Sequence, residues 1–464
     1  MKRILSGILA CAMVLTLTAA LAPAALAAVS TSYVNEAGEP QMPIMAEPIT
    51  GGGATTIGTD DIETWYIVNN NISYADTLTI IGNVNIILMD GKSLAVEKTA
   101  LGTSHAEAIS VASGASLTIW SQSLGDDMGE LFAKSTQTTS SLYINSGIYL
   151  NGGSLTMNGG KITAEAIQNN AGYSEGIYGS GSSSIVTVNA GLVTVTGKRI
   201  NGNGGAYGIE CGTTIIHGGT VYVNADAPTS TDSYSFGISG KTTITGGTVH
   251  VNVKSGAHGT GLSGMLTISG GTVDIDLVTG GRAVGMNQSS TISDDAKVTI
   301  SARATGSYAY GINANADVRG SAQLKVYAEG AGSGMTAGIY GTSPYIIGDT
   351  VVDVMAKHNG TGDVYGIYGS NDITVGNSST DTATVTATAT GNANAYGIYA
   401  NHASTSSKIN YGTVAATGTG TQGTGIYVAG GGLVISGGRV SAVGHSTDGG
   451  ISAAPAQRPS PAAR

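Results

Sequence analysis

Short runs of alternating apolar and polar residues follow one another from about residue 140 onward, and they recur at a regular interval. A glycine followed by an aliphatic residue marks each interval. The eleven pairs are Gly147-Ile148, Gly176-Ile177, Gly208-Ile209, Gly237-Ile238, Gly261-Leu262, Gly285-Met286, Gly311-Ile312, Gly338-Ile339, Gly366-Ile367, Gly397-Ile398 and Gly425-Ile426. Their spacing of about 28 residues lies in the range that indicates a solenoid or another repeat array.

Each interval contains three short alternating runs separated by glycine. In the interval that opens at Gly261, the second run extends from Met265 to Ile268 and the third from Thr272 to Asp276. Alternation rich in β-branched residues predicts strands, and no window shows the 3.6-residue period of a helix. We therefore predict an all-β fold, a parallel β-helix with three short strands per coil. We expect it to be right-handed, because parallel crossovers almost always are.

Three segments precede the repeats. Residues 1–27 combine two basic residues, an apolar run and a small-residue cleavage site, which is typical of a secretory signal peptide. Residues 28–60 contain three prolines and a glycine triplet without periodicity, so we expect a linker or an irregular arm. Residues 61–146 hold the densest apolar runs, and we expect them to form coils that cap the N-terminal end.

The remaining boundaries follow from where the pattern stops. The repeats occupy residues 147–452, and residues 453–464, rich in Pro and Ala, are expected to be a disordered or truncated tail. No apolar span of membrane length follows the signal peptide. We therefore expect a secreted, extracellular chain, either free or associated with the cell surface.

Composition narrows the class of partner. Charged residues make up only 11% of the chain, the formal net charge is −10, and no cluster of Lys and Arg occurs. Binding to nucleic acid requires a basic surface, so this class of partner is excluded. Cys211 is the only cysteine after the signal peptide, so stability must come from the stacking of coils instead of a disulfide within the chain.

The N-terminal coils resemble a known family. The segments concerned are Trp65-Tyr66-Ile67-Val68, Val84-Asn85-Ile86-Ile87-Leu88-Met89-Asp90-Gly91-Lys92-Ser93-Leu94, Ile109-Ser110-Val111 and Gly114-Ala115-Ser116-Leu117-Thr118-Ile119-Trp120. With the Gly-Gly-Thr-Val corners that follow, they resemble the secreted or cell-surface parallel β-helix proteins of Gram-positive bacteria that are classed as carbohydrate-binding. The resemblance covers about residues 62 to 450. It implies a protein that binds plant-type polysaccharide, with or without calcium, and has no assigned catalysis.

One outward position holds tyrosine in four consecutive coils. If the Ile of each Gly-Ile pair points inward, the next residue points outward, because side chains alternate along a strand. These residues are Tyr340, Tyr368, Tyr399 and Tyr427. Aromatic rings with a hydroxyl group suit sugar rings, so the ladder is a candidate carbohydrate-binding surface. The alternative is that the rings only stabilise the sheet by packing on one another.

The same alternation rule assigns a direction to a second set of rings. The residue two positions before the Ile shares its inward parity, and we expect these rings to pack in the core or at a corner. They are Tyr207, Phe236, Tyr310, Tyr365 and Tyr396.

The strand after each Gly-Gly corner carries a second outward stripe. It consists of Tyr222, His250, Asp274, Thr299 and Lys325, flanked by Asn224, Asn252, Asp276 and Ser301. Asp274 and Asp276 lie two apart on one strand, so one interpretation is a shared calcium ion with the asparagine carbonyls nearby. The other interpretation is a solvated polar face.

No catalytic pattern is present, although β-helices include pectinases. A polygalacturonase-like set needs Asn-Thr-Asp, Asp-Asp, His-Gly and Arg-x-Lys about one coil apart. Asp294-Asp295 occurs, but it replaces a Gly-Gly corner and the other elements are missing or out of order. Paired carboxylates at glycosidase separation remain open, since they depend on three-dimensional distances.

These observations predict a polysaccharide-binding β-helix protein without catalysis and without a required cofactor. One alternative is a structural or adhesin-like surface protein that binds a protein partner. The second is a lyase or hydrolase that degrades pectin or glucan.

Overall fold

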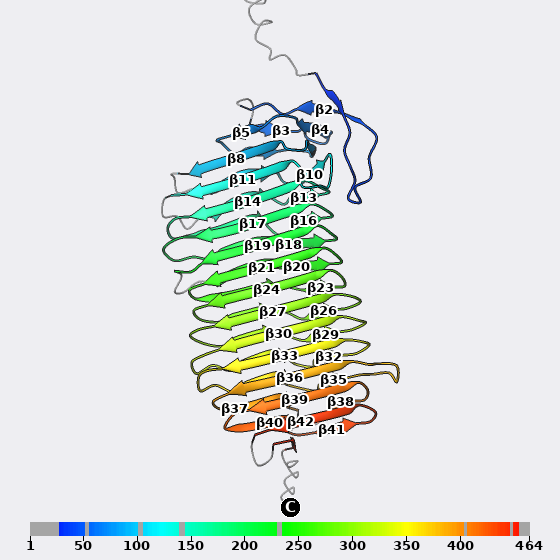
Figure 1. The fold of residues 1–464 in the computed structure, drawn as a ribbon. Coiled ribbons are helices and arrows are strands. Elements are labelled where there is room, and N and C mark those ends of the chain that lie inside the picture. Colours follow the sequence, from blue (N-terminus) through cyan, green and yellow to red (C-terminus); the bar gives the residue numbers. More distant parts are fainter. Residues whose placement is uncertain are drawn as a thin grey trace, which may run out of the picture.

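The computed structural model describes residues 27–51, 55–100, 105–138, 144–229, 234–402, 406–445 and 449–453. These residues form one column of stacked coils (Figure 1), and they contain strands and no helix. The predicted all-β parallel β-helix with three strands per coil is confirmed. Residues 1–26 of the predicted signal peptide and residues 454–464 of the predicted tail lie outside the described residues.

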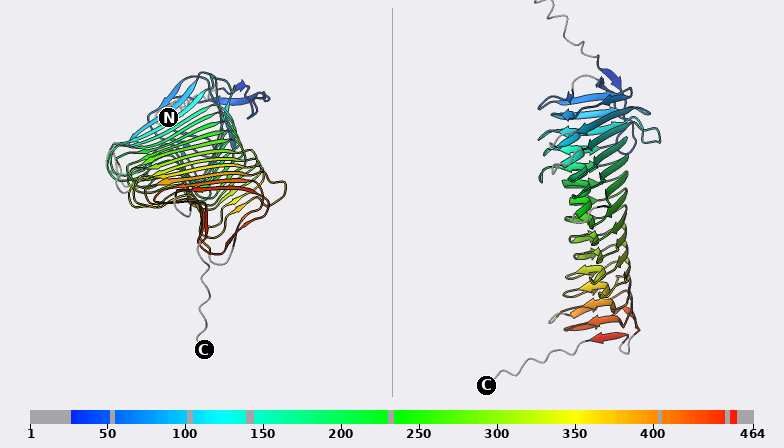
Figure 2. Two further views of the ribbon diagram at one scale, coloured as in Figure 1. Left: turned by 60° about the horizontal axis from the view of Figure 1, so that its bottom comes forward. Right: turned by 90° about the vertical axis from the view of Figure 1, so that its left-hand side faces the viewer.

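Three parallel ladders run the length of the column (Figure 2). The first ladder carries the Gly-Ile pairs. Its strands are β3 (Thr56–Ile57), β6 (Leu78–Ile80), β9 (Ala106–Val111), β12 (Ile144–Leu150), β15 (Tyr173–Gly179), the first part of β18 (Ala206–Ile216) and of β20 (Tyr234–Ile244), β22 (His258–Ser263), β25 (Ala283–Met286), β28 (Ala309–Ile312), β31 (Thr336–Gly341), β34 (Val364–Gly369), β37 (Asn394–Ala400), β40 (Gln422–Val428) and β43 (Ile451–Ala453).

The second ladder follows the first within each coil. Because β18 and β20 run through both ladders, the two join into a single sheet. The other strands of the second ladder are β2 (Ile44–Pro48), β4 (Glu63–Val68), β7 (Asn83–Leu88), β10 (Ser116–Ser121), β13 (Ser154–Met157), β16 (Ile185–Val188), β23 (Leu266–Ile268), β26 (Ser290–Ile292), β29 (Ala316–Val318), β32 (Tyr345–Ile346), β35 (Thr374–Val375), β38 (Ser406–Ile409) and β41 (Gly432–Ile435).

The third ladder has fourteen strands among the described residues and forms a sheet of its own. They are β5 (Ile72–Tyr74), β8 (Ser93–Ala100), β11 (Glu130–Gln137), β14 (Lys161–Gln168), β17 (Leu192–Arg199), β19 (Thr220–Ala227), β21 (Thr248–Ser255), β24 (Thr272–Thr279), β27 (Lys297–Ala304), β30 (Gln323–Gly330), β33 (Val351–His358), β36 (Thr384–Gly391), β39 (Thr413–Thr419) and β42 (Arg439–Gly444).

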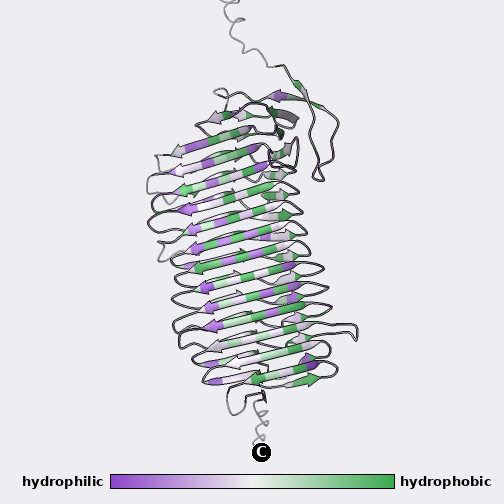
Figure 3. Ribbon diagram, viewed as in Figure 1, coloured by the Kyte–Doolittle hydropathy of each residue, from purple (hydrophilic) through white to green (hydrophobic). Residues whose placement is uncertain are grey.

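One core runs through the whole column. Hydrophobic and hydrophilic residues alternate along the strands (Figure 3), so the aliphatic side chains of all three ladders meet inside. Val352 and Val354 of the third ladder are buried, whereas Val351, Asp353 and Met355 between and beside them are exposed. The alternating pattern therefore accounts for both the strands and the core.

The glycine of each Gly-Ile pair interrupts this alternation. A Cβ atom on Gly338 would lie 2.0 Å from Cγ1 of Val354 and 2.8 Å from the carbonyl oxygen of Gly366, so no larger residue fits there. In β34 both Gly366 and Ile367 are buried, and the outward positions become Tyr365 and Tyr368, three residues apart. An irregularity of this kind resembles a β-bulge in its effect, because it re-aims the side chains that follow.

The prediction that the rings before the Gly-Ile pairs are packed is confirmed for Tyr310 and Tyr365, which are buried, but their predicted inward direction is wrong. Tyr310 and Tyr365 pack with Tyr340 and Tyr368 in a cluster that is separate from the main core. Tyr207 and Phe236 are only partly buried, and their rings stack on each other. The alternation rule fails here because it assumes that inward and outward residues strictly alternate. The glycine of each pair and the aliphatic residue after it both point inward.

The N-terminal segment is an ordered arm and not a linker. β1 (Val29–Thr31) pairs antiparallel with β2, and β2 pairs in parallel with β4. The ring of Tyr33 lies 5.3 Å from that of Trp65 and 5.1 Å from that of Trp120, measured between centroids. The arm is thus fixed to the outside of the second ladder at the N-terminal end of the column, where Figure 1 shows it in dark blue.

The coils of residues 61–146 continue into the repeats without a break in the pairing of the third ladder. β8, β11 and β14 pair in register, so residues 61–146 belong to the same column as the repeats.

Among the described residues, no helix has the length and apolar character needed to cross a membrane.

Candidate functional site

The four tyrosines predicted as a ladder lie in register on the first ladder. Tyr340, Tyr368, Tyr399 and Tyr427 come from β31, β34, β37 and β40. Their successive ring centroids are 4.5, 5.3 and 5.2 Å apart, with interplanar angles of 11°, 6° and 14°. The rings therefore stack face to face along the column.

A second file of rings lies beside this stack. Tyr365 meets Tyr368 edge to face at 5.1 Å, and Tyr396 meets Tyr399 in the same way at 4.9 Å. Tyr310 stacks on Tyr340 at 5.2 Å. We call the whole set the tyrosine surface. It comprises Tyr308, Tyr310, Tyr340, Tyr365, Tyr368, Tyr396, Tyr399 and Tyr427.

Packing determines what the tyrosine surface can present to a ligand. Tyr368 and Tyr399 each have a stacked ring on both faces, so only their edges and hydroxyl groups face outward. Burial, and after it the neighbouring charge of Asp363, raises the pKa of Tyr396 to about 12. The phenol is therefore uncharged at neutral pH. Sugar rings pack on exposed aromatic faces, but the ring faces of Tyr368 and Tyr399 are covered by neighbouring tyrosines.

The predicted polar stripe is also in register, on the third ladder. Tyr222, His250, Asp274 and Thr299 lie side by side on β19, β21, β24 and β27. The rings of Tyr222 and His250 stack at 4.9 Å with an interplanar angle of 13°. His250 Nδ1 lies 3.3 Å from Asp274 Oδ2. An aromatic pair is thus followed directly by a carboxylate.

The flanking stripe is hydrogen-bonded along the column. Asn252 Nδ2 donates to Asn224 Oδ1 at 3.2 Å. Asp276 Oδ1 lies 3.6 Å from Nη1 of Arg303, whose guanidinium lies over the ring of Tyr327 at 5.4 Å. These side chains remain partly exposed, so they keep capacity for hydrogen bonds to a ligand.

Side chains of unequal length leave hollows over these two stripes. One of about 500 Å³ and one of about 370 Å³ adjoin at Asn252 and Asp276, which line both, and their volumes are in the range of ligand sites. We call the two hollows together the polar groove. Its lining residues are Glu165, Thr196, Lys198, Tyr222, Asn224, Asp226, His250, Asn252, Lys254, Asp274, Asp276, Val278, Thr299, Ser301 and Arg303, with backbone of the same strands.

A third hollow of about 630 Å³ meets the groove at Tyr222. Glu36 of the N-terminal arm, Leu124 and Met128 line its far side. Tyr222 is 38% exposed and stands between the two spaces. It is therefore the most accessible aromatic residue of the groove, and the sequence pattern alone did not distinguish it from its neighbours.

Asp274 and Asp276 provide a poor set of calcium ligands. Asp274 faces His250 and Asp276 faces Arg303, so a cationic or ring nitrogen already accompanies each carboxylate. In the part of the chain that the structure describes, no group of three or more His, Cys, Asp and Glu residues could hold a metal ion. Calcium prefers six to eight oxygen ligands, and the function proposed below does not use it.

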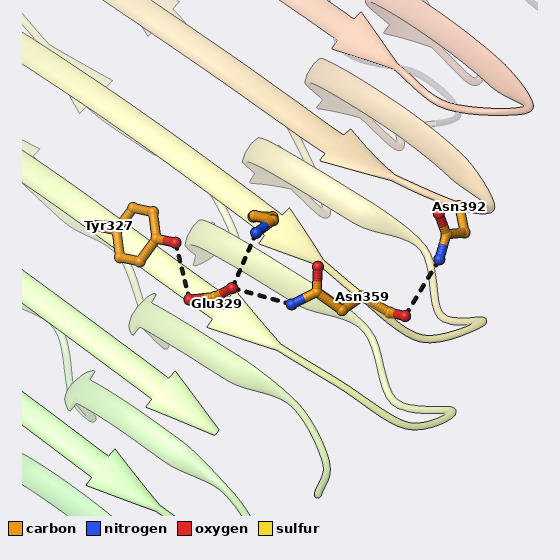
Figure 4. A network of polar contacts seen from close by, with 5 residues as sticks. Tyr327, Glu329, Asn359 and Asn392 are labelled. Carbon is orange, nitrogen blue, oxygen red and sulfur yellow. Dashed lines mark hydrogen bonds and ion pairs between the residues drawn. The ribbon is translucent and has the colours of Figure 1, made fainter. Parts of the chain in front are cut away.

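Beyond the groove, the third-ladder surface continues as a hydrogen-bonded network (Figure 4). Tyr327 Oη and Asn359 Nδ2 each donate to Glu329 at 2.9 Å, and Asn392 Nδ2 donates to the Asn359 carbonyl at 3.2 Å. Burial acts to raise the pKa of Glu329, but these hydrogen bonds and that from Lys357 outweigh it and lower the pKa. Here the polar groups satisfy one another and leave less for a ligand.

A pair of carboxyl groups on the first ladder was not identified in the sequence analysis. Glu175 pairs in register with Tyr207, and Glu210 follows Ile209 in the next coil, so the two acids occupy the places that Tyr365 and Tyr399 hold further along. Glu175 is only 2% exposed. Burial, followed by the charge of Glu210, raises its pKa well above the ordinary value. The sequence does contain a signal for this pair, because a charged residue stands next to a Gly-Ile pair at a position where other coils have an aromatic residue.

No protein-family model, no curated protein and no solved structure matches this chain.

Proposed function

We propose that the chain is an extracellular polysaccharide-binding protein without catalysis and that the polar groove of the third ladder is its binding site. One observation carries the proposal. The stacked pair of Tyr222 and His250 opens onto a groove lined by amides, carboxylates and a guanidinium across consecutive strands. Such sites combine an apolar ring surface with a few polar groups that fix orientation.

The tyrosine surface is the weaker candidate for the same ligand. Tyr368 and Tyr399 have a stacked ring on both faces, whereas Tyr222 has one stacked ring, that of His250, and is 38% exposed. We infer that the tyrosine surface mainly stabilises the column. The family resemblance of the N-terminal segment and its signal-peptide pattern support an extracellular carbohydrate-binding role.

Retention on insoluble polysaccharides tests the proposal. The chain from residue 28 onward is expected to be retained on at least one plant-type polysaccharide. Tyr222→Ala should weaken retention about tenfold or more, since it removes the exposed ring of the groove. Tyr368→Ala combined with Tyr399→Ala is the matched control, because it removes two rings from the other surface and should leave retention unchanged.

The remaining results would each contradict the proposal in a different way. Loss of retention only in the Tyr368 and Tyr399 variant would place the site on the tyrosine surface. Release of sugar into the supernatant would indicate the lyase or hydrolase alternative. Absence of retention on every polysaccharide would leave the adhesin alternative, which is tested with protein partners.

A further inference from the structure

The charges of the polar groove limit the kind of chain that it can hold. Its lining contains four carboxylates and three cations, which leaves a net charge of −1 with His250 neutral. The carboxylates are Glu165, Asp226, Asp274 and Asp276, and the cations are Lys198, Lys254 and Arg303. The chain as a whole carries a formal charge of −10. The lining of the groove therefore carries no excess of positive charge that would attract a polyanion.

The arrangement of these charges matters as much as their sum. Lys198, Asp226 and Lys254 follow one another in register on β17, β19 and β21, so the sign alternates from coil to coil. Arg303 lies beside Asp276. A polyuronate carries a carboxylate on every sugar unit, and its recognition would need a run of cations, as binding of other polyanions does. The carboxylates of a polyuronate bound in this groove would face acidic side chains of the protein about as often as basic ones.

The same arrangement suits hydroxyl groups. Carboxylate, amide and guanidinium groups placed side by side offer acceptors and donors at every coil, and hydrogen bonds to charged groups are stronger than those between neutral groups. The lining extends over six consecutive strands, β14 to β27. With a strand spacing of about 4.8 Å, the lining residues of the two hollows together span about 24 Å along the column. A linear chain laid along the column would meet at least one polar side chain in each coil.

We propose that the polar groove holds an uncharged, hydroxyl-rich glycan chain laid along the column and discriminates against polyuronates. This inference rests on the proposed function and specifies the ligand class of the same site. Tyr222 and His250 supply the ring surface, and Asn252, Asp276 and Arg303 supply the hydrogen bonds.

Affinity measurements with soluble glycans of matched length test the inference. The probes are a neutral β-glucan, a neutral galactomannan, polygalacturonate and a cationic glucosamine polymer, each at low and high NaCl concentration. At least one neutral chain should bind about tenfold more tightly than polygalacturonate and the cationic polymer at low salt. Its affinity should change less than about twofold with salt, because screening acts on charged ligands.

A pair of variants locates the effect. Asp276→Asn removes a carboxylate inside the groove and should weaken the neutral chain about threefold or more while strengthening polygalacturonate. Asp353→Asn is the control, because Asp353 is an exposed residue of the same ladder that lies opposite Lys325 and outside the groove. It changes the total charge equally and should alter neither affinity. Circular dichroism of both variants confirms that they fold.

Several outcomes would overturn the inference. Polygalacturonate or the cationic polymer binding as tightly as the neutral chains would refute the ligand class. The same would follow if neutral binding collapsed at high salt, or if both variants behaved alike. In each of these cases the protein would still bind glycan, so the proposed function would stand. If no soluble or insoluble polysaccharide binds, the proposed function fails together with this inference.

Discussion

The tyrosine surface lies on the first ladder, where a glycine interrupts the alternation of side chains, and the polar groove lies on the third ladder, where the alternation is regular. Both lie on in-register strands of one column. In the tyrosine surface, neighbouring rings cover one another, and Tyr365 is 8% exposed. In the groove, Tyr222 remains 38% exposed. An outward side chain of this column is therefore either covered or accessible, according to what its neighbours in the next coils are.

Repetition and variation explain the difference. Identical residues placed in register stack into a continuous layer, because each ring meets a partner of the same size and shape. The groove has a different residue in every coil, from Tyr222 through His250 and Asp274 to Thr299. Side chains of unequal length cannot form a level layer, so hollows remain between them. Loss of repetition at outward positions thus accounts for the hollows of the groove.

The largest effect is expected from filling the glycine that creates the tyrosine surface. Gly338→Ala places a Cβ atom 2.0 Å from Val354 Cγ1, which forces the first ladder away from the third. We expect a loss of about 3 kcal/mol in the free energy of unfolding, measured by urea denaturation. Gly432→Ala is the control, because its Cβ atom would lie 3.4 Å from its nearest neighbour, Ser406 Oγ. Equal losses in both variants would show that the close approach is not the cause.

A smaller effect is expected from interrupting the stack itself. Tyr368→Ala combined with Tyr399→Ala removes two half-buried rings and their mutual contacts, so we expect a loss of about 2 kcal/mol in unfolding free energy. Tyr368→Phe with Tyr399→Phe keeps the stacking and should cost less than about 0.5 kcal/mol. If the alanine variant were as stable as the parent protein, the tyrosine surface would lose its stabilising role and the comparison with the groove would fail.

The smallest effect on stability is expected in the two neighbouring coils where Glu175 and Glu210 occupy positions that hold tyrosine in other coils. The raised pKa of Glu175 means that the folded state binds this proton more tightly than the unfolded chain does. The stabilisation is complete below the ordinary pKa of 4.5 and is lost as pH rises through the raised pKa. Glu175→Gln should therefore make the unfolding free energy decline less with rising pH. Glu97→Gln, at an exposed site on β8, is the control and should leave the pH dependence of the unfolding free energy unchanged. If the two variants showed the same pH dependence, this account would be contradicted.

The sequence was sufficient for most of the fold. The spacing of the Gly-Ile pairs and the alternation between them predicted the coil, its three strands and the register of Tyr340, Tyr368, Tyr399 and Tyr427. These features are local or repeat at a fixed interval, and in a solenoid each coil contacts only its neighbours. The same reasoning placed Asp274 and Asp276 on one outward face of their strand, although Arg303, which lies beside Asp276, emerged only in three dimensions.

Other features depended on contacts that no local pattern encodes. Tyr365 faces outward because Gly366 turns an extra residue inward against the third ladder, about twenty residues further along the chain. The N-terminal arm is ordered because Tyr33 packs against two stacked tryptophans, Trp65 and Trp120, from separate coils. The hollows of the groove depend on the relative lengths of side chains from several coils.

By itself, then, the sequence determined the period, the strands and which residues share a face, because those follow from backbone geometry and the burial of aliphatic side chains. Only the tertiary structure decided which shared face is covered and which is open. That distinction depends on how outward side chains from successive coils fill the space above the sheet. At Tyr368 they fill it with one another, and at Tyr222 they leave room for a ligand.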